Sequence, residues 1–217
     1  MEESVWAFGW SHLLTIVQII ATIAIALVGF KTFKQWKLQQ IEDKRINTAL
    51  EALSLAYESK FVFAYIRSPL SFSGEWEDMP SVEGESEQTR RNKGAYFVPL
   101  SRIMNQKDFF HKSYSLMPRF MALFGSEKEA IFDKLHSARK DVQIAGELLI
   151  EESITRFQPN SLDPEFIKQL KADLWLPLSK SKKDDQVGRK VLEFITEIEE
   201  ICLPVINRTT KKIATPV

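Results

Sequence analysis

The sequence has few of the residues that build covalent cross-links and metal or catalytic centres. Its 217 residues include one cysteine, Cys202, and three histidines. A single thiol excludes an intramolecular disulfide framework and most zinc sites. The 29 basic side chains are balanced by 29 acidic ones, and this lack of a basic excess argues against a nucleic-acid partner. A mean hydropathy of −0.18 excludes a protein with many membrane spans but allows one.

The motifs that anchor common catalytic chemistry are also missing. The sequence contains no GxGxxG, no Walker loop, no GxSxG and no HExxH. Cys202 falls on an apolar stripe, which is typical of a core residue rather than a nucleophile. We therefore expect a protein that is not an enzyme and has no catalytic residue, no cofactor and no metal site.

Charged side chains are absent from Ser4 to Phe30, and Leu13 to Phe30 is almost continuously apolar. As a helix these 18 residues rise about 27 Å, close to the hydrocarbon thickness of a bilayer. Aromatic rings, which prefer the membrane interface, flank this run: Trp6, Phe8, Trp10, Phe33 and Trp36. The pattern predicts a transmembrane helix over residues 12–30 in the lipid bilayer, after a short external N-terminus over residues 1–11.

Two other interpretations of this run are a cleaved signal peptide and a buried core helix. A signal peptide has a basic start, whereas this chain starts Met1-Glu2-Glu3 and shows no small-residue cleavage site before Lys31. A core helix with 27 uncharged residues and aromatic ends would be unusually long. A membrane span explains the pattern better than either alternative.

The charges on the two sides of the span predict its orientation. The N-terminal flank has two Glu and no Lys or Arg, whereas residues 31–45 form a basic neck. Its basic residues are Lys31, Lys34, Lys37, Lys44 and Arg45. Because basic flanks favour the cytoplasmic side, we expect a single-pass protein of the inner (cytoplasmic) membrane with the N-terminus outside. A lone thiol agrees with a reducing compartment for residues 31–217.

Small and polar residues recur inside the span at steps of three and four, which places them on one face of a helix. They are Ser11, Thr15, Gln18, Thr22, Ala26 and Gly29. In lipid such a stripe favours contact between helices, so it indicates a homo-oligomer. An accidental arrangement of well-tolerated residues and the lining of a hydrated pore are the other two interpretations.

Beyond the span, every strong periodic signal is helical. Apolar residues at three- and four-residue steps predict a first cytoplasmic helix that ends near Ile66. They are Ile46, Leu50, Leu53, Tyr57, Phe61 and Ala64. This helix can continue from the membrane helix without a break, because no Pro or Gly lies between Lys31 and Arg67.

Four further helices are predicted. One runs from about Val98 to Phe124 with a kink at Pro118. The next follows a capping box that starts at Ser126, and carries a packing seam of Ile131, Leu135, Ala138, Val142, Ala145 and Leu149.

The last two helices are a short one that starts at Asp163-Pro164 and one from about Asp184 to Ile206. Since no strand pattern of any length occurs, we expect an all-α protein. One N-terminal transmembrane helix then precedes a cytoplasmic helical bundle of about five helices over residues 46–206. A flexible basic tail is expected over residues 207–217.

Residues 71–94 form the one long irregular segment, rich in Gly, Pro and acidic side chains. A solvated linker explains such a composition. A partner-binding or regulatory loop is the alternative, because loops of this length often have a function. The residues that indicate it are Glu75, Trp76 and Glu77, with Trp76 as an aromatic in a polar context.

Several segments within residues 12–150 resemble a group of bacterial proteins in which one N-terminal membrane helix precedes a cytoplasmic helical domain. The segments are Tyr65-Ile66-Arg67-Ser68-Pro69, Gly74-Glu75, Arg119 to Gly125, Phe132 to Leu135 and Ala145 to Leu149. The resemblance implies this architecture but no activity. Its residues therefore add support for the fold and none for a reaction.

Taken together, these patterns predict a membrane-anchored cytoplasmic interaction, scaffold or sensing module that is not catalytic and self-associates. Its protein partner is not identified by the sequence. The alternative function is a membrane-perturbing or pore-forming effector of the antiphage-defence type, gated by its cytoplasmic domain. Small single-pass proteins with helical cytoplasmic parts occur among such effectors, which is an analogy of architecture alone.

Overall fold

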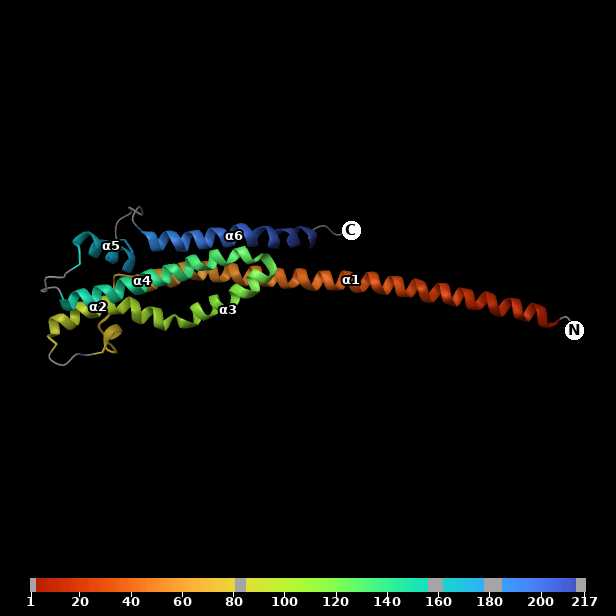
Figure 1. Ribbon diagram of the computed structural model, residues 1–217, viewed down its shortest axis with the longest axis horizontal. Coiled ribbons are helices and arrows are strands. Elements are labelled where there is room, and N and C mark those ends of the chain that lie inside the picture. The colour runs from red at the N-terminus through yellow and green to blue at the C-terminus, as the bar shows by residue number, and fades with distance from the viewer. Residues whose placement is uncertain (1–2, 81–84, 156–161, 178–184, 214–217) are drawn as a thin grey trace. The chain divides into compact units, whose positions relative to one another are not determined.

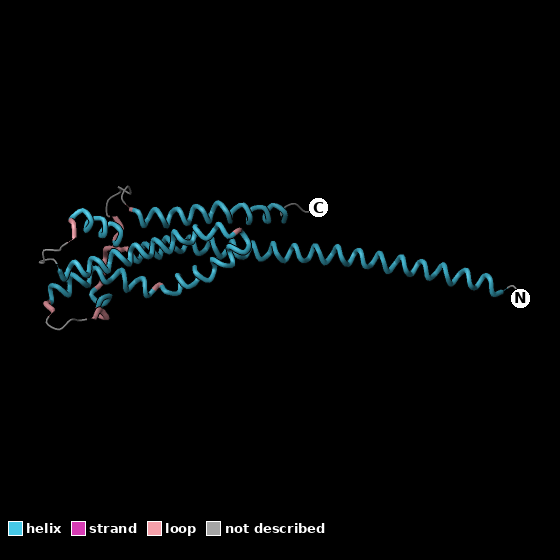
Figure 2. The backbone as a smooth tube through the Cα atoms, viewed as in Figure 1, coloured by secondary structure: helices cyan, strands magenta, loops and turns pink. Residues whose placement is uncertain are grey.

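The computed structural model describes residues 3–80, 85–155, 162–177 and 185–213. These residues are almost entirely helical, and none of them is in a β-strand (Figure 2). The chain divides into two compact units, Met1–Arg45 and Ile46–Val217.

The first unit consists of the N-terminal part of helix α1, which spans Glu3–Ile66. The most apolar 18-residue stretch of α1 has a mean hydropathy of 2.5, and none of this stretch is buried. A core helix of a soluble protein would be mostly covered. Within the described residues, α1 is the one helix long and apolar enough to cross a membrane.

The part of α1 in the second unit contributes to the core through a face that includes only one buried residue, Leu53, of the stripe from which the helix was predicted. The side chains of Leu50, Tyr57 and Phe61 are exposed, with Phe61 71% exposed. The buried face instead contains Ala49, Ala52, Leu53, Leu55, Ala56, Ser59, Val62, Phe63 and Ile66. Small Ala and Ser side chains allow neighbouring helices to approach closely, so they form the packing face even though the larger side chains define the apparent stripe.

Five more α-helices complete the second unit (Figure 1). They are α2 (Glu87–Asn105), α3 (Lys107–Phe124), α4 (Glu129–Thr155), α5 (Pro164–Leu174) and α6 (Gln186–Ile213), with short 3-10 helices at Ser73–Trp76 and Ser126–Lys128. Helix α4 lies at the centre, because it packs against α2, α5 and α6. All six residues of its predicted seam are buried, which confirms that prediction.

Four predicted helix boundaries differ from the structure. Helix α2 begins at Glu87 rather than near Val98, so residues 87–94 of the segment predicted to be irregular are helical. The helix expected over residues 98–124 is two helices that break at Gln106, where the backbone leaves helical geometry (φ −96°, ψ 19°), while Pro118 remains inside α3. Ser126 begins a 3-10 turn instead of capping α4. Helix α6 continues to Ile213, beyond its expected end, and residues 178–184 and 214–217 lie outside the described part.

Aromatic rings join the helices of the second unit. Phe120 of α3, Phe132 of α4 and Phe194 of α6 form a chain of edge-to-face contacts, with ring centroids 5.5 and 5.7 Å apart. All three rings are fully buried. Such contacts add to the hydrophobic stabilisation of the core, so the scaffold around any site in this unit is well packed.

Candidate functional site

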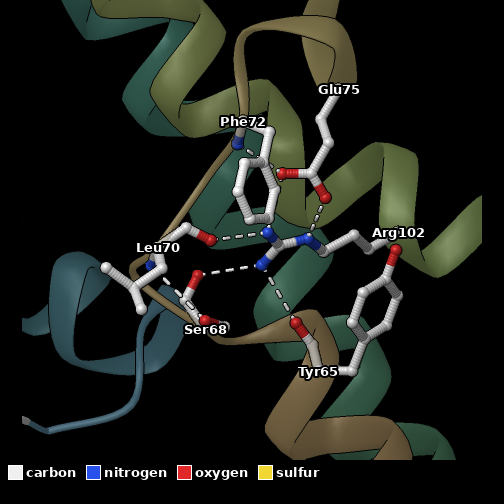
Figure 3. A network of polar contacts seen from close by, with 6 residues as sticks. All are labelled: Tyr65, Ser68, Leu70, Phe72, Glu75 and Arg102. Carbon is white, nitrogen blue, oxygen red and sulfur yellow. Dashed lines mark hydrogen bonds and ion pairs between the residues drawn. The ribbon is translucent and has the colours of Figure 1, made fainter.

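The buried guanidinium of Arg102 holds the segment that follows α1 (Figure 3). Arg102 is 3% exposed, and all five of its N–H groups donate hydrogen bonds. Three go to the backbone carbonyls of Tyr65 (3.0 Å), Ser68 (2.9 Å) and Leu70 (2.7 Å). Two go to the carboxylate of Glu75, each at 2.8 Å. The hydrogen bonds from Arg102 lower the pKa of Glu75, and those to the carbonyls fix the backbone where the chain leaves α1.

A second arginine, Arg67, does the same for the end of α5. It is 1% exposed and donates to the carbonyls of Ala172 (2.7 Å), Asp173 (3.0 Å) and Trp175 (3.0 Å). Its Nη1 forms an ion pair with Asp185 at 2.8 Å, which joins the ends of α1 and α5 to the start of α6. Burial lowers the pKa of Arg67, and Asp185 opposes this shift.

Arg67 lies in the segment Tyr65–Pro69, and Arg102 contacts both this segment and Glu75. All N–H donors of Arg102 are used within the protein, so none remains for a ligand. Arg67 makes four polar contacts within the protein, three to backbone carbonyls and one to Asp185. Sequence reasoning missed both roles. The one available signal was the position of Arg67, directly after the last helical residue of α1.

The three loop residues proposed from the sequence have different surroundings. The carboxylate of Glu75 is committed to Arg102, whereas Glu77 is exposed. Trp76 is half-buried and lies against Gly94 of α2, where a Cβ atom would come within 2.7 Å of the indole ring. Gly94 is therefore required by the close approach of this ring, and Trp76 fastens the loop to α2.

A groove of about 260 Å³ lies between α2, α4 and α5. It is lined by Arg91, Asn92, Ala95, Tyr96, Leu149, Glu152, Ser153, Ile167, Lys171 and Trp175. The rings of Tyr96 and Trp175 stack with centroids 5.5 Å apart. Because Arg67 holds the Trp175 carbonyl, the second arginine also fixes one wall of the groove.

The polar side chains of the groove differ in how they are used. Glu152 is buried and accepts a hydrogen bond from the backbone N–H of Leu162 at 3.1 Å. Arg91 forms an exposed pair with Glu87, and Lys171 comes from the opposite wall. Two cations beside stacked aromatic rings are suited to a flat ring that carries an anionic group.

Two other titratable groups of the described residues, His136 and Cys202, lie in aromatic or apolar surroundings. The described residues contain no group of three or more His, Cys, Asp or Glu side chains placed to hold a metal ion. The ring of His136 stacks on Tyr114 (3.9 Å) and shares a hydrogen bond with Ser113, and burial lowers its pKa. Burial raises the pKa of the Cys202 thiol to about 12, so this thiol stays protonated and unreactive at neutral pH.

The stripe of small and polar residues predicted for the apolar run lies on α1 throughout, although the side chain of Ser11 is outside the described part. Thr15, Gln18, Ala26 and Gly29 are exposed. The hydroxyl of Thr22 donates to the Gln18 carbonyl at 2.8 Å, so its hydrogen bond is made within its own helix.

Searches with protein-family models, of curated proteins and of solved structures found no match to this chain.

Proposed function

We propose that this protein is a single-pass membrane-anchored helical module that self-associates and acts by binding rather than by catalysis. The observation that supports the anchor is the uncovered apolar stretch of α1, with a mean hydropathy of 2.5 and no buried residue. Exposing a run of this length to water is unfavourable at about 25 cal/mol per Å² of apolar surface. A bilayer removes this cost.

The orientation proposed for this module has the N-terminus outside and the second unit in the cytoplasm of the cell. Its support is the charge difference between Glu2 and Glu3 on one side and the basic neck, residues 31–45, on the other. Self-association is supported by the small and polar side chains on one face of the span, because they allow close helix contact in lipid.

Membrane fractionation of the full-length protein tests the anchor. After a high-salt wash and alkaline carbonate extraction, we expect the protein to remain in the pellet with a mass that includes residues 1–30. A matched variant with Ile16, Ile20 and Ile23 changed to Lys should move to the soluble fraction or fail to accumulate, since each central Lys costs about 3 kcal/mol in a span. Complete extraction of the unaltered protein, or a mass that shows cleavage after the apolar run, would contradict the anchor.

The groove between α2, α4 and α5 is the binding site that we assign to the module. Its cations, Arg91 and Lys171, and its stacked pair, Tyr96 and Trp175, favour a small ligand that combines a flat ring with an anionic group. A ligand of this class would give the module a sensing role.

A second candidate function is a pore-forming effector, and the polar stripe of the span is the observation that favours it. The hydrogen bond from Thr22 to its own helix backbone leaves this hydroxyl less available to line a channel. Expression with a membrane-potential dye distinguishes the two functions. A pore predicts depolarisation that is lost when Thr15, Gln18 and Thr22 become Val, Leu and Val. An anchored binding module predicts no depolarisation in either case.

A further inference from the structure

Three lysines directly after the apolar run of α1 lie on one face of this helix. Lys31, Lys34 and Lys37 follow one another at steps of three residues, and α1 is continuous from Glu3 to Ile66. Because each step of three turns the helix by about 300°, the three side chains fall within an arc of about 120°. All three are exposed. We call these three residues the lysine face.

The ammonium groups of the lysine face are not neutralised within the described part of the chain. None of them takes part there in an ion pair or a side-chain hydrogen bond. No Asp or Glu lies three or four positions from any of them in the sequence. Like charges on neighbouring positions of a helix repel one another, so an anionic surface beside this face would relieve the repulsion.

An aromatic pair at the same level of α1 indicates the depth at which the lysine face lies. Phe33 and Trp36 are 61% and 53% exposed, with ring centroids 5.9 Å apart. Exposed rings beside an apolar run are typical of the interface between hydrocarbon and water. From Lys31 to Lys37 the helix rises about 9 Å. In a membrane-spanning α1, the lysine face and these rings would therefore share the layer of the phospholipid headgroups.

The other basic residues of the neck are less suited to a contact with headgroups. Lys44 and Arg45 lie about 20 Å further along α1 than Lys31, which exceeds the Debye length of about 8 Å at physiological ionic strength. Arg45 is also partly buried. The lysine face is therefore the part of the neck that would act on the membrane surface.

We propose that the lysine face binds the phosphate groups of anionic phospholipids in the adjoining leaflet, the cytoplasmic leaflet in the orientation given above. This inference rests on the proposed membrane anchor and adds a lipid partner to it. Orientation requires only an excess of basic residues on one side, whereas placing three of them on one face concentrates their charge on neighbouring headgroups. Each Lys close to an anionic membrane surface strengthens binding about fivefold.

Native mass spectrometry of the full-length protein in detergent tests this binding. With an equimolar mixture of phosphatidylglycerol and phosphatidylcholine that have the same acyl chains, we expect the unaltered protein to carry at least tenfold more phosphatidylglycerol. Changing the whole lysine face to Gln should bring the ratio close to one, whereas changing it to Arg should preserve the preference. A matched control, which should also preserve it, loses the same charge at three exposed lysines of the second unit: Lys60, Lys107 and Lys140.

The possible failures give different results. Release of the protein from membranes by carbonate would refute the anchor itself. In protein that resists carbonate, equal binding of the two lipids would overturn the lysine face alone, as would a preference that the Gln changes leave intact or that the control changes also remove. Displacement of the lipid by inorganic phosphate at the same concentration would overturn it too, because it would show a site for soluble anions. Since the three lysines are exposed, the Gln variant should keep the circular dichroism of the unaltered protein.

Discussion

At the scale of single residues, Arg102 combines burial with complete use of its hydrogen-bond donors. Replacing it with Ala removes five hydrogen bonds and leaves Glu75 and three carbonyls without this partner. We expect Arg102→Ala to lower the free energy of unfolding by about 3 kcal/mol. Arg102→Lys should lose most of this amount, because one ammonium cannot reproduce the planar fork. Urea unfolding followed by circular dichroism measures both.

Arg91 is a suitable control for this stability measurement. It pairs with Glu87 one helical turn away, and its side chain is 63% exposed. Such pairs contribute about 0.5 kcal/mol or less, so Arg91→Ala should leave the urea midpoint almost unchanged. Similar losses for the two alanine variants would show that Arg102 does not hold the loop.

Asp173 provides a prediction about pH. Burial, with the nearby carboxylate of Asp141, raises the pKa of Asp173 above its usual value. In the window between the unfolded and folded pKa values the native state binds more protons, so stability falls as pH rises through it. The Asp173→Asn substitution removes this loss of stability, because the amide side chain does not ionise. We therefore expect the variant to be more stable than the unaltered protein at pH 7 and to lose this advantage below about pH 3.5.

Urea titrations of both proteins at pH 7 and below about pH 3.5 check the sign of this stability difference. All other titrating groups are common to the two proteins, so their contributions cancel in the comparison. A gain of equal size at both pH values would mean that the carboxylate charge is not its source. A loss at pH 7 would mean that the attraction of Asp173 to Arg67 and Lys190 outweighs its burial.

At the scale of elements, the sequence predicted the helices better than it predicted their packing faces. The seam of α4 was correct because its six residues recur at a regular spacing and four of them are apolar side chains larger than Ala. On α1 the same criterion selected Leu50, Tyr57 and Phe61, which are exposed. Packing instead uses Ala49, Ala52 and Ala56, whose small side chains carry little weight in a hydrophobic pattern. The break at Gln106 has no Gly or Pro to mark it.

The groove could not have been predicted from the sequence, because three separate elements line it. Tyr96 and Trp175 stack only when α2 and α5 both pack on α4. Arg67 fixes Trp175 through a backbone carbonyl, a contact that leaves no trace in a side-chain pattern. Sequence motifs identify residues that act together when these residues lie close in the sequence. The residues that line this groove come from three separate helices and the segment after α5.

The groove on these three helices leads to a binding prediction. Adenosine monophosphate and adenosine share a flat ring and differ in the anionic phosphate, so they probe the two parts of the site separately. We expect the monophosphate to bind the detergent-solubilised protein more tightly. Lys171→Ala should weaken its binding by about tenfold, the loss of one charge-assisted hydrogen bond. Isothermal titration calorimetry measures these affinities.

Lys168→Ala is the matched control, because Lys168 lies on the same helix but outside the groove and pairs with Glu165 on the surface. It should bind the monophosphate as the unaltered protein does. Equal weakening by both substitutions would indicate a general charge effect. No binding of either probe would contradict a groove built for an anionic ring of this size.

At the scale of the whole molecule, the zero net charge hides an uneven distribution. The charge-free run from Ser4 to Phe30 separates an acidic start from the basic neck. An even distribution would give no preferred direction of insertion. This asymmetry is therefore the feature on which the proposed orientation of the chain depends.

Thiol labelling in spheroplasts checks that direction. In the Cys202→Ser background, Ser4→Cys should react with a membrane-impermeant maleimide from outside, whereas Ser126→Cys, exposed in the second unit, should react only after lysis. Changing Lys31, Lys34 and Lys37 to Glu weakens the basic neck, so the fraction of Ser126→Cys labelled from outside should rise. External labelling of Ser126→Cys in the unaltered neck would reverse the proposed orientation. Because the residues that line the groove all lie after residue 45, that result would also place its ligand outside the cell.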